Sequence, residues 1–273
     1  MQSVALFLRT ISTTMQASKA VIRKLFPILF WIAVWGFAAW RVGNTLLFPD
    51  PLAVLRALWQ LLQTEGFYRA TWLSLWNVLS GILFAMLLGI FLAVFTHRIP
   101  FLHELTLPIM TVIKATPVAS FIVLLLIWIG SSKVPTLITF LIVLPVVWTN
   151  LDEGLRQQDK QLAEVAWIYR FSRLQKLRLL TVPTAMPYFL SACRTSLGLA
   201  WKAGIAAEII AMPPDTIGTM IGQARQYLNT EEMFAWTLTV IVLSLVLEFC
   251  TVALLNRLER KKRDSVRKEQ SSC

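Results

Sequence analysis

The chain has 273 residues, of which 56% are hydrophobic and 15% are charged, and its mean hydropathy is +0.64. This composition excludes an ordinary soluble domain and indicates an integral membrane protein. The formal charge of +11 would suit a nucleic-acid partner in a soluble protein. Here the basic residues lie between long apolar runs, so we expect a membrane protein that binds membrane lipid and no nucleic acid.

Long apolar runs follow one another along the chain. A helix needs roughly 20 residues to cross the hydrocarbon core of a bilayer. Runs of about this length lie at residues 25–47, 72–95, 109–129, 134–150, 188–212 and 234–255. They are continuous rather than alternating, which disfavours a barrel of strands. We therefore expect an all-α integral membrane protein with about six transmembrane helices.

Basic residues are unequally divided between the two sides of these runs. With the amino terminus in the cytoplasm, the cytoplasmic segments hold Arg9, Lys19, Arg23, Lys24, Arg98, Arg156, Lys160, Arg170, Arg173, Lys176, Arg178 and the basic residues of the tail from Arg257 to Lys268. The outer loops hold only Arg41, Arg56, Arg69, Lys133 and Arg225. The positive-inside rule then predicts a multi-pass membrane protein with both termini in the cytoplasm.

The same pattern divides the chain into three parts. Residues 1–24 are expected to form a cytoplasmic or interfacial segment rather than a cleaved signal peptide, because no basic region precedes their apolar part. Residues 25–258 are expected to form the transmembrane domain, with a long cytoplasmic loop at 152–182. Residues 259–273 form a basic cytoplasmic tail, either a solvated flank or a contact for anionic lipid.

Motifs of enzymes are missing from the sequence. It has no phosphate loop, no His-Glu-x-x-His zinc helix and no Gly-x-Ser-x-Gly elbow. The histidines, His97 and His103, are expected to be surface or interface residues, and Cys193, Cys250 and Cys273 show no metal-ligand spacing. We expect no catalytic residue, no metal and no cofactor bound by this chain.

The long loop carries an unusual basic passage. In residues 163–180 apolar positions recur at helical spacing, and the basic residues Arg170, Arg173, Lys176 and Arg178 occupy the other side. An amphipathic basic element of this kind buries against a partner or against lipid headgroups. The loop is long enough for one or two short helices.

The spacing within this passage resembles a family signature. Inner-membrane permeases of binding-protein-dependent ATP-binding-cassette importers carry Glu-Ala-Ala, three residues, Gly, nine residues, Ile, one residue and Leu-Pro. This chain has Glu164-Val165-Ala166, then Arg170, then Leu180, and then Val182-Pro183 at the same spacing. Arg170 stands where the family has glycine, so it either adopts a left-handed conformation at some cost or straightens the turn.

The resemblance extends from about residue 48 to residue 258. The fragments LFPDPLAVLRALWQLL, IKATPVASFIVLLLIWIG, TVPTAMPYFLSACRTSLGLAW and AAEIIA are similar to the permeases for nitrate, sulfonate, taurine, bicarbonate and thiamin-pyrimidine precursors. The resemblance implies a type I importer permease fold in the bacterial cytoplasmic membrane. It also implies three partners: a second permease copy that forms a homodimer, an ATPase dimer that binds the ATP, and an extracytoplasmic substrate-binding protein. Residues Glu164, Ala166, Arg170, Arg173, Leu180 and Pro183 would then couple the permease to the ATPase.

Ionisable residues within apolar runs are candidates for the translocation path, because they are costly in a bilayer. Lys114, Lys202 and Glu208 lie in such runs, and Thr116 with Pro117 predicts a helix break after Lys114. A basic lining favours an anion such as a sulfonate or a carboxylate. These residues equally suit a structural role, as snorkelling lysines or paired charges.

Two amphipathic segments, at 49–66 and 217–232, are expected on the outer side. They form either a platform for the binding protein or helices that lie on the membrane surface. The preferred function is an importer subunit that has no catalytic activity. The alternatives are a stand-alone secondary transporter or channel and, third, a membrane-embedded lipid-modifying enzyme.

Overall fold

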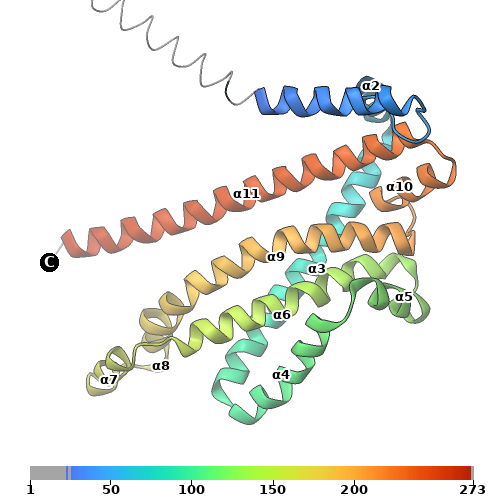
Figure 1. The fold of residues 1–273 in the computed structure, drawn as a ribbon. Coiled ribbons are helices and arrows are strands. Elements are labelled where there is room, and N and C mark those ends of the chain that lie inside the picture. The colour runs from blue at the N-terminus through green and yellow to red at the C-terminus, as the bar shows by residue number, and fades with distance from the viewer. Residues whose placement is uncertain (1–22, 24–25, 272–273) are drawn as a thin grey trace, which may run out of the picture.

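The computed structural model describes residue 23 and residues 26–271, and all regular elements in this part of the chain are helical (Figure 1). The all-α class is therefore confirmed. The predicted amino-terminal segment 1–24 lies, apart from residue 23, outside the described residues. The elements are a helix at Phe26–Val42, α2 (Pro51–Leu62), α3 (Glu65–Arg98), α4 (Pro100–Ala115), α5 (Val118–Ile129), the 3-10 turn η1 (Ser131–Lys133), α6 (Val134–Arg156), α7 (Lys160–Ile168), α8 (Arg173–Lys176), the π-helical turn η2 (Leu177–Thr181), α9 (Val182–Ala211), α10 (Ile217–Gln226) and α11 (Thr230–Ser271).

Several helices have the length and apolarity of membrane spans. Among the described residues these are Glu65–Arg98, Ser131–Arg156 and Thr230–Leu255, and the bent pair α4 and α5 qualifies when it is taken as one span. The 30-residue α9 runs beside α6 through the same bundle (Figure 1). Each predicted apolar run thus forms helix, although the first yields only the shorter apolar helix Phe26–Val42.

The third predicted run, 109–129, is not one helix. α4 ends at Ala115, and α5 begins at Val118 after a bend of 103°. Thr116 has extended backbone angles (φ −79°, ψ 130°), because the following Pro117 disfavours the helical conformation for the residue before it. The break predicted at Thr116 and Pro117 is confirmed.

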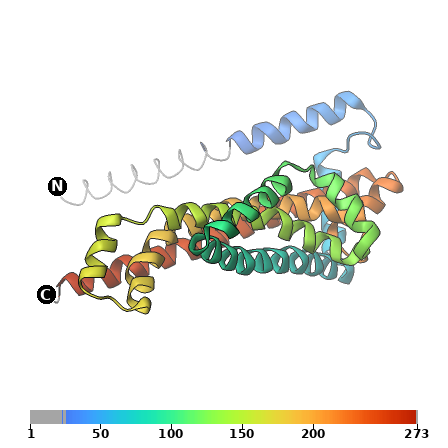
Figure 2. The same cartoon turned by 90° about the horizontal axis from the view of Figure 1, so that it is seen from below.

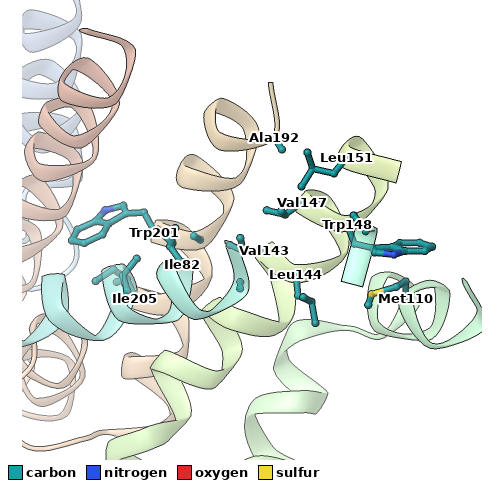
Figure 3. Packing of buried hydrophobic residues seen from close by; sticks show 14 of the residues in the cluster. Ile82, Met110, Val143, Leu144, Val147, Trp148, Leu151, Ala192, Trp201 and Ile205 are labelled. Atoms are coloured by element: carbon teal, nitrogen blue, oxygen red, sulfur yellow. The ribbon is translucent and has the colours of Figure 1, made fainter. Parts of the chain in front are cut away.

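The core lies where α6 packs between α3 and α9. Figure 3 shows Val143 and Val147 of α6 beside Ile82 of α3, in one buried cluster with Ala192 and Trp201 of α9. Small residues allow these helices to approach closely, since a Cβ at Gly204 of α9 would lie 2.6 Å from Val78 Cγ2 of α3. Small residues recur at every fourth position of α9, at Ala192, Ser196, Ala200 and Gly204, and all four are buried, so they are used for packing within the chain.

The two ends of the bundle carry different short helices. Figure 1 shows α7 and α8 at one end, beside the far part of α11, and α2, α5 and α10 at the opposite end. The view in Figure 2 shows the same separation along the bundle. Helix α2 packs on α11, and α10 packs on α9 and α11. The two predicted amphipathic segments are thus short helices at one end, and the predicted tail continues α11 as far as Ser271.

Candidate functional site

The turn between α7 and α8 keeps its tight geometry although it lacks glycine. Arg170 adopts φ +50°, in the left-handed region. The amide of Phe171 donates to the carbonyl of Ala166 (2.9 Å), and the amide of Arg170 donates to the carbonyl of Trp167 (3.0 Å). This is the bonding pattern with which helices end on a left-handed residue. Of the two predicted outcomes for Arg170, the left-handed turn is the one observed.

α8 is fixed at its start and joins α9 without a loop. The Ser172 hydroxyl accepts from the amide of Gln175 (3.3 Å), and the Gln175 side chain accepts from the amide of Ser172 (2.8 Å), which forms a capping box. The π-helical turn η2 then leads directly into α9. Gln158, which precedes α7, donates to the Thr181 hydroxyl at the end of η2 (2.8 Å). The α7–α8 element is thus a closed unit attached to α9.

The predicted coupling residues all lie in or beside this unit. Glu164, Arg170 and Arg173 are exposed, and Leu180 and Pro183 are half-buried. Ala166, a residue of α7, is buried. Large apolar side chains are exposed on the same unit, and we call this set the α7–α8 patch: Leu162, Val165, Trp167, Ile168, Tyr169 and Leu174. A contiguous exposed apolar patch marks an interaction site.

A cavity of about 470 Å³ lies beside the break between α4 and α5. Three of the predicted path residues line it, namely Lys114, Thr116 and Lys202. The remaining walls come from α4, α5, α6 and α9 and consist of Ile113, Val118, Leu141, Ile142, Pro145, Val146, Leu199, Ala203 and Ala206. Two lysine side chains thus line one mostly apolar space, which we call the membrane cavity.

The hydrogen bonding of the two lysines leaves their charges uncompensated in the described part of the chain. Lys114 Nζ donates to the Thr149 hydroxyl (2.7 Å), which donates in turn to the Pro145 carbonyl (2.7 Å). Among the described side chains neither Lys114 nor Lys202 forms an ion pair. The cavity can therefore compensate a negative charge on a ligand. Thr149 was missed by the sequence analysis, and its only signal there was a hydroxyl within an apolar run.

The other two predicted path residues do not line the membrane cavity. Pro117 fixes the break beside it. Glu208 is fully buried and accepts from Ser74 Oγ (2.6 Å), from Asn77 Nδ2 (3.3 Å) and from the Gly218 amide (3.1 Å). Its partners come from α3 and α10, and the structure separates it from Lys202.

A polar cluster also joins α4 to α6 just before the α7–α8 element. The largely buried Asp152 accepts from Arg156 Nε (2.9 Å), and its Oδ2 lies 3.1 Å from His103 Nε2. The His103 ring stacks on Trp148, with ring centroids 5.5 Å apart. From the sequence, His103 was expected at a surface or an interface. Asp152, which follows an apolar run, was not predicted as a functional residue. No group of three or more metal-ligating side chains was found among the described residues.

Comparison with known proteins gives the family. Residues 85–264 match the model of the binding-protein-dependent transport system inner membrane component. The chain is 28% identical over 232 residues to the taurine transport system permease protein TauC of Escherichia coli (strain K12), covering 82% of this chain and 83% of the relative. It is 29% identical over 230 residues to the riboflavin transport system permease protein RibX of Chloroflexus aurantiacus (strain ATCC 29366 / DSM 635 / J-10-fl), covering 80% and 84%.

The fold is also that of a solved transporter. The structure of a bacterial ABC transporter involved in the import of the acidic polysaccharide alginate aligns with 91% of this chain and 99% of that chain, with a TM-score of 0.62 and 18% identity. This likeness supports the type I importer permease fold, and the family model covers well over half of the sequence. The chain therefore belongs to the inner membrane components of binding-protein-dependent transport systems, the permeases of ABC importers.

Proposed function

We propose that this permease forms the translocation path for a small anionic solute, of the sulfonate, nitrate, bicarbonate or thiamin-precursor type. The observation that carries the proposal is the membrane cavity, which Lys114 and Lys202 both line without an acidic partner among the described side chains. Thr116 adds a hydroxyl to the lining, and Pro117 holds the break open beside it. The similarity to a taurine permease supports a sulfonate. The similarity to a riboflavin permease makes that larger solute the competing substrate.

ATP is hydrolysed, in this proposal, by a separate ATPase dimer that docks on the α7–α8 element. The α7–α8 patch supplies the apolar anchor, and the exposed Glu164, Arg170 and Arg173 supply charge-assisted contacts around it. Ala166 is buried within α7, and Leu180 and Pro183 are half-buried where η2 passes into α9. Movement of the ATPase is then transmitted through η2 into α9, which carries Lys202 of the membrane cavity.

The remaining partners follow from the two ends of the bundle. α3 ends at Arg98 and α6 ends at Arg156, and residues of both helix ends line one cavity just before the α7–α8 element. The far part of α11 lies at the same end of the bundle as α7 and α8 (Figure 1), so we place this end, with both termini, in the cytoplasm. The substrate-binding protein then docks on the opposite end, formed by α2 and α10. A solved relative of this fold was crystallised with a substrate-bound periplasmic protein, which supports this partner. A second copy of the chain completes the path, and this permease itself binds no cofactor.

Affinity purification of the full chain from its native membrane in a mild detergent tests the proposal. An ATPase subunit that carries a phosphate-loop motif is expected to co-purify, and the isolated permease is expected to show no ATP hydrolysis. A chain that purifies without an ATPase, and that moves the solute across liposome membranes by itself, would support a stand-alone secondary transporter or channel instead.

A further inference from the structure

A buried carboxylate joins three helices at the end of the bundle opposite α7 and α8. Glu208 of α9 accepts hydrogen bonds from Ser74 and Asn77 of α3 and from the amide of Gly218 in α10. The Ser74 hydroxyl also accepts from the amide of Ile217 (2.9 Å). Glu208 and Ser74 are both fully buried, so water is excluded from the bond between them, whereas Asn77 is half-buried. Loss of one partner would leave buried polar groups unsatisfied.

The backbone at the start of α10 is shaped to fit this carboxylate. A Cβ at Gly218 would lie 2.3 Å from Glu208 Cβ and 2.7 Å from the amide nitrogen of Ile209, so the two helices approach more closely than any side chain at 218 would allow. The amide of Gly218, in the first turn of α10, donates to the Glu208 carboxyl group, and the amide of Ile217 donates to the Ser74 hydroxyl. α10 is therefore held to α9 and α3 by both packing and hydrogen bonds.

The position of Glu208 along α9 links this junction to the opposite end of the bundle. α9 begins at η2, directly after the α7–α8 element, and Glu208 lies in its last turn. One helix thus connects the proposed ATPase side to the helix α10 of the proposed binding-protein side. Lys202 of the membrane cavity lies between the two ends of α9.

We propose that Glu208 is a positioning residue that makes α10 move together with α9 and α3, so that docking of the binding protein is transmitted to the ATPase. Glu208 contacts no solute in this role. The inference rests on the proposed importer function, and it concerns the link between the two ends rather than the path itself. Without Glu208 the path and the ATPase contact persist, but docking at α10 no longer changes the rate of hydrolysis.

The experiment uses the full chain with its ATPase in lipid nanodiscs. ATP hydrolysis is measured without and with a saturating amount of the substrate-binding protein loaded with taurine. For Glu208→Ala we expect basal hydrolysis and ATPase retention within about twofold of the parent and stimulation reduced at least about tenfold, within the usual range of a coupling between sites. Glu208→Gln is expected to recover at least half of the stimulation. Its amide oxygen accepts from Ser74 and Gly218 once the Asn77 amide is reversed.

Two further variants decide between positioning and mere folding. Ser74→Ala removes the hydroxyl that bridges Glu208 and Ile217 with little change in volume, and it is expected to reduce stimulation at least about threefold at unchanged basal hydrolysis. Asp215→Asn is the matched control, because it breaks the exposed Arg69–Asp215 pair (2.7 Å) between α3 and the same α9–α10 connection. It is expected to leave stimulation within about twofold, as for other exposed pairs.

The outcomes separate this inference from the proposed function. A parent complex without stimulation by the loaded binding protein contradicts the proposed function itself. A stimulated parent with equally stimulated Glu208→Ala and Ser74→Ala variants overturns the positioning role. Loss of both basal and stimulated hydrolysis in both variants also overturns the positioning role, because the junction would then be needed for folding alone.

Discussion

The amide of Phe171 donates to the carbonyl of Ala166 across 2.9 Å, and this bond closes α7 around Arg170 at φ +50°. A left-handed conformation costs a residue other than glycine roughly 1–2 kcal/mol. The turn is nevertheless formed, because capping bonds on both sides of it, at the end of α7 and at the start of α8, restrict the backbone. The geometry that glycine provides in the family signature is therefore preserved here by its surroundings.

This turn predicts the behaviour of two substitutions at one position. Arg170→Gly keeps the left-handed turn without strain but removes one of the proposed charge contacts, so it should retain more ATPase than a variant that cannot form the turn. Arg170→Val places a β-branched side chain at positive φ and should reduce co-purified ATPase at least about tenfold. The control is Lys176→Val, which removes a basic side chain at a helical φ of −59°. Equal retention of the ATPase by all three variants would contradict the account of the turn.

Glu164 tests the charge contact on the α7–α8 element. Glu164→Lys reverses an exposed charge outside the membrane, so the chain should still insert and fold. Reversal of a charge-assisted contact at a desolvated interface costs on the order of 2–5 kcal/mol, whereas an exposed helical position loses under about 1 kcal/mol. We expect loss of the ATPase or loss of coupled uptake, measured on one preparation.

Glu153→Lys is the control for Glu164→Lys. Glu153 is exposed in α6 at the same end of the bundle and interacts with Gln157 of its own helix (2.8 Å). It should retain the ATPase and transport like the parent. If Glu164→Lys does so too, the α7–α8 element does not couple the permease to the ATPase.

The membrane cavity predicts a charge requirement for transport. Lys114→Met and Lys202→Met keep the length and apolar stem of the side chain but remove a cation, so uptake of taurine should fall at least about tenfold in each variant. ATPase retention should be unchanged. Lys133→Met, at the opposite end of α5 from the break, is the control and should transport normally. Undiminished taurine uptake by both cavity variants would exclude the cavity from the anion path.

Packing of α9 predicts a difference between two glycines of the same helix. A Cβ at Gly204 would lie 2.6 Å from Val78 Cγ2 and 3.0 Å from Thr139 Oγ1, whereas a Cβ at Gly198 would meet nothing within 4 Å. Overpacking by Gly204→Ala should destabilise the chain by about 1–3 kcal/mol. Gly198→Ala should be neutral or stabilise the helix by up to about 1 kcal/mol. Thermal unfolding in detergent compares the two, and an equal midpoint for both would contradict the packing.

Local features of this chain were accessible from sequence. Apolar runs predicted the helices, because each must satisfy its backbone internally in a bilayer. Pro117 predicted the break after Ala115, since a proline restricts the residue before it. The length of the loop and the helical spacing of its apolar residues predicted the short helices α7 and α8. In each case the cause lies within a few residues of the effect.

Relationships between distant segments were not accessible. Glu208 was assigned to the path because it is an acid within an apolar run, but its partners Ser74 and Asn77 lie more than 130 positions earlier. The size of the 103° bend depends on how α5 packs against α6 and α9 rather than on Pro117 alone. Lys114 and Lys202 lie on different helices, and only the fold brings them to one cavity.

Directional uptake tests the central claim most directly. Proteoliposomes contain the permease and its ATPase, with ATP trapped inside, and labelled taurine and the substrate-binding protein are added outside. The account predicts that accumulation requires the ATPase, ATP inside the proteoliposomes and the binding protein outside them. Accumulation by the permease alone, without ATP or without the binding protein, would contradict the account.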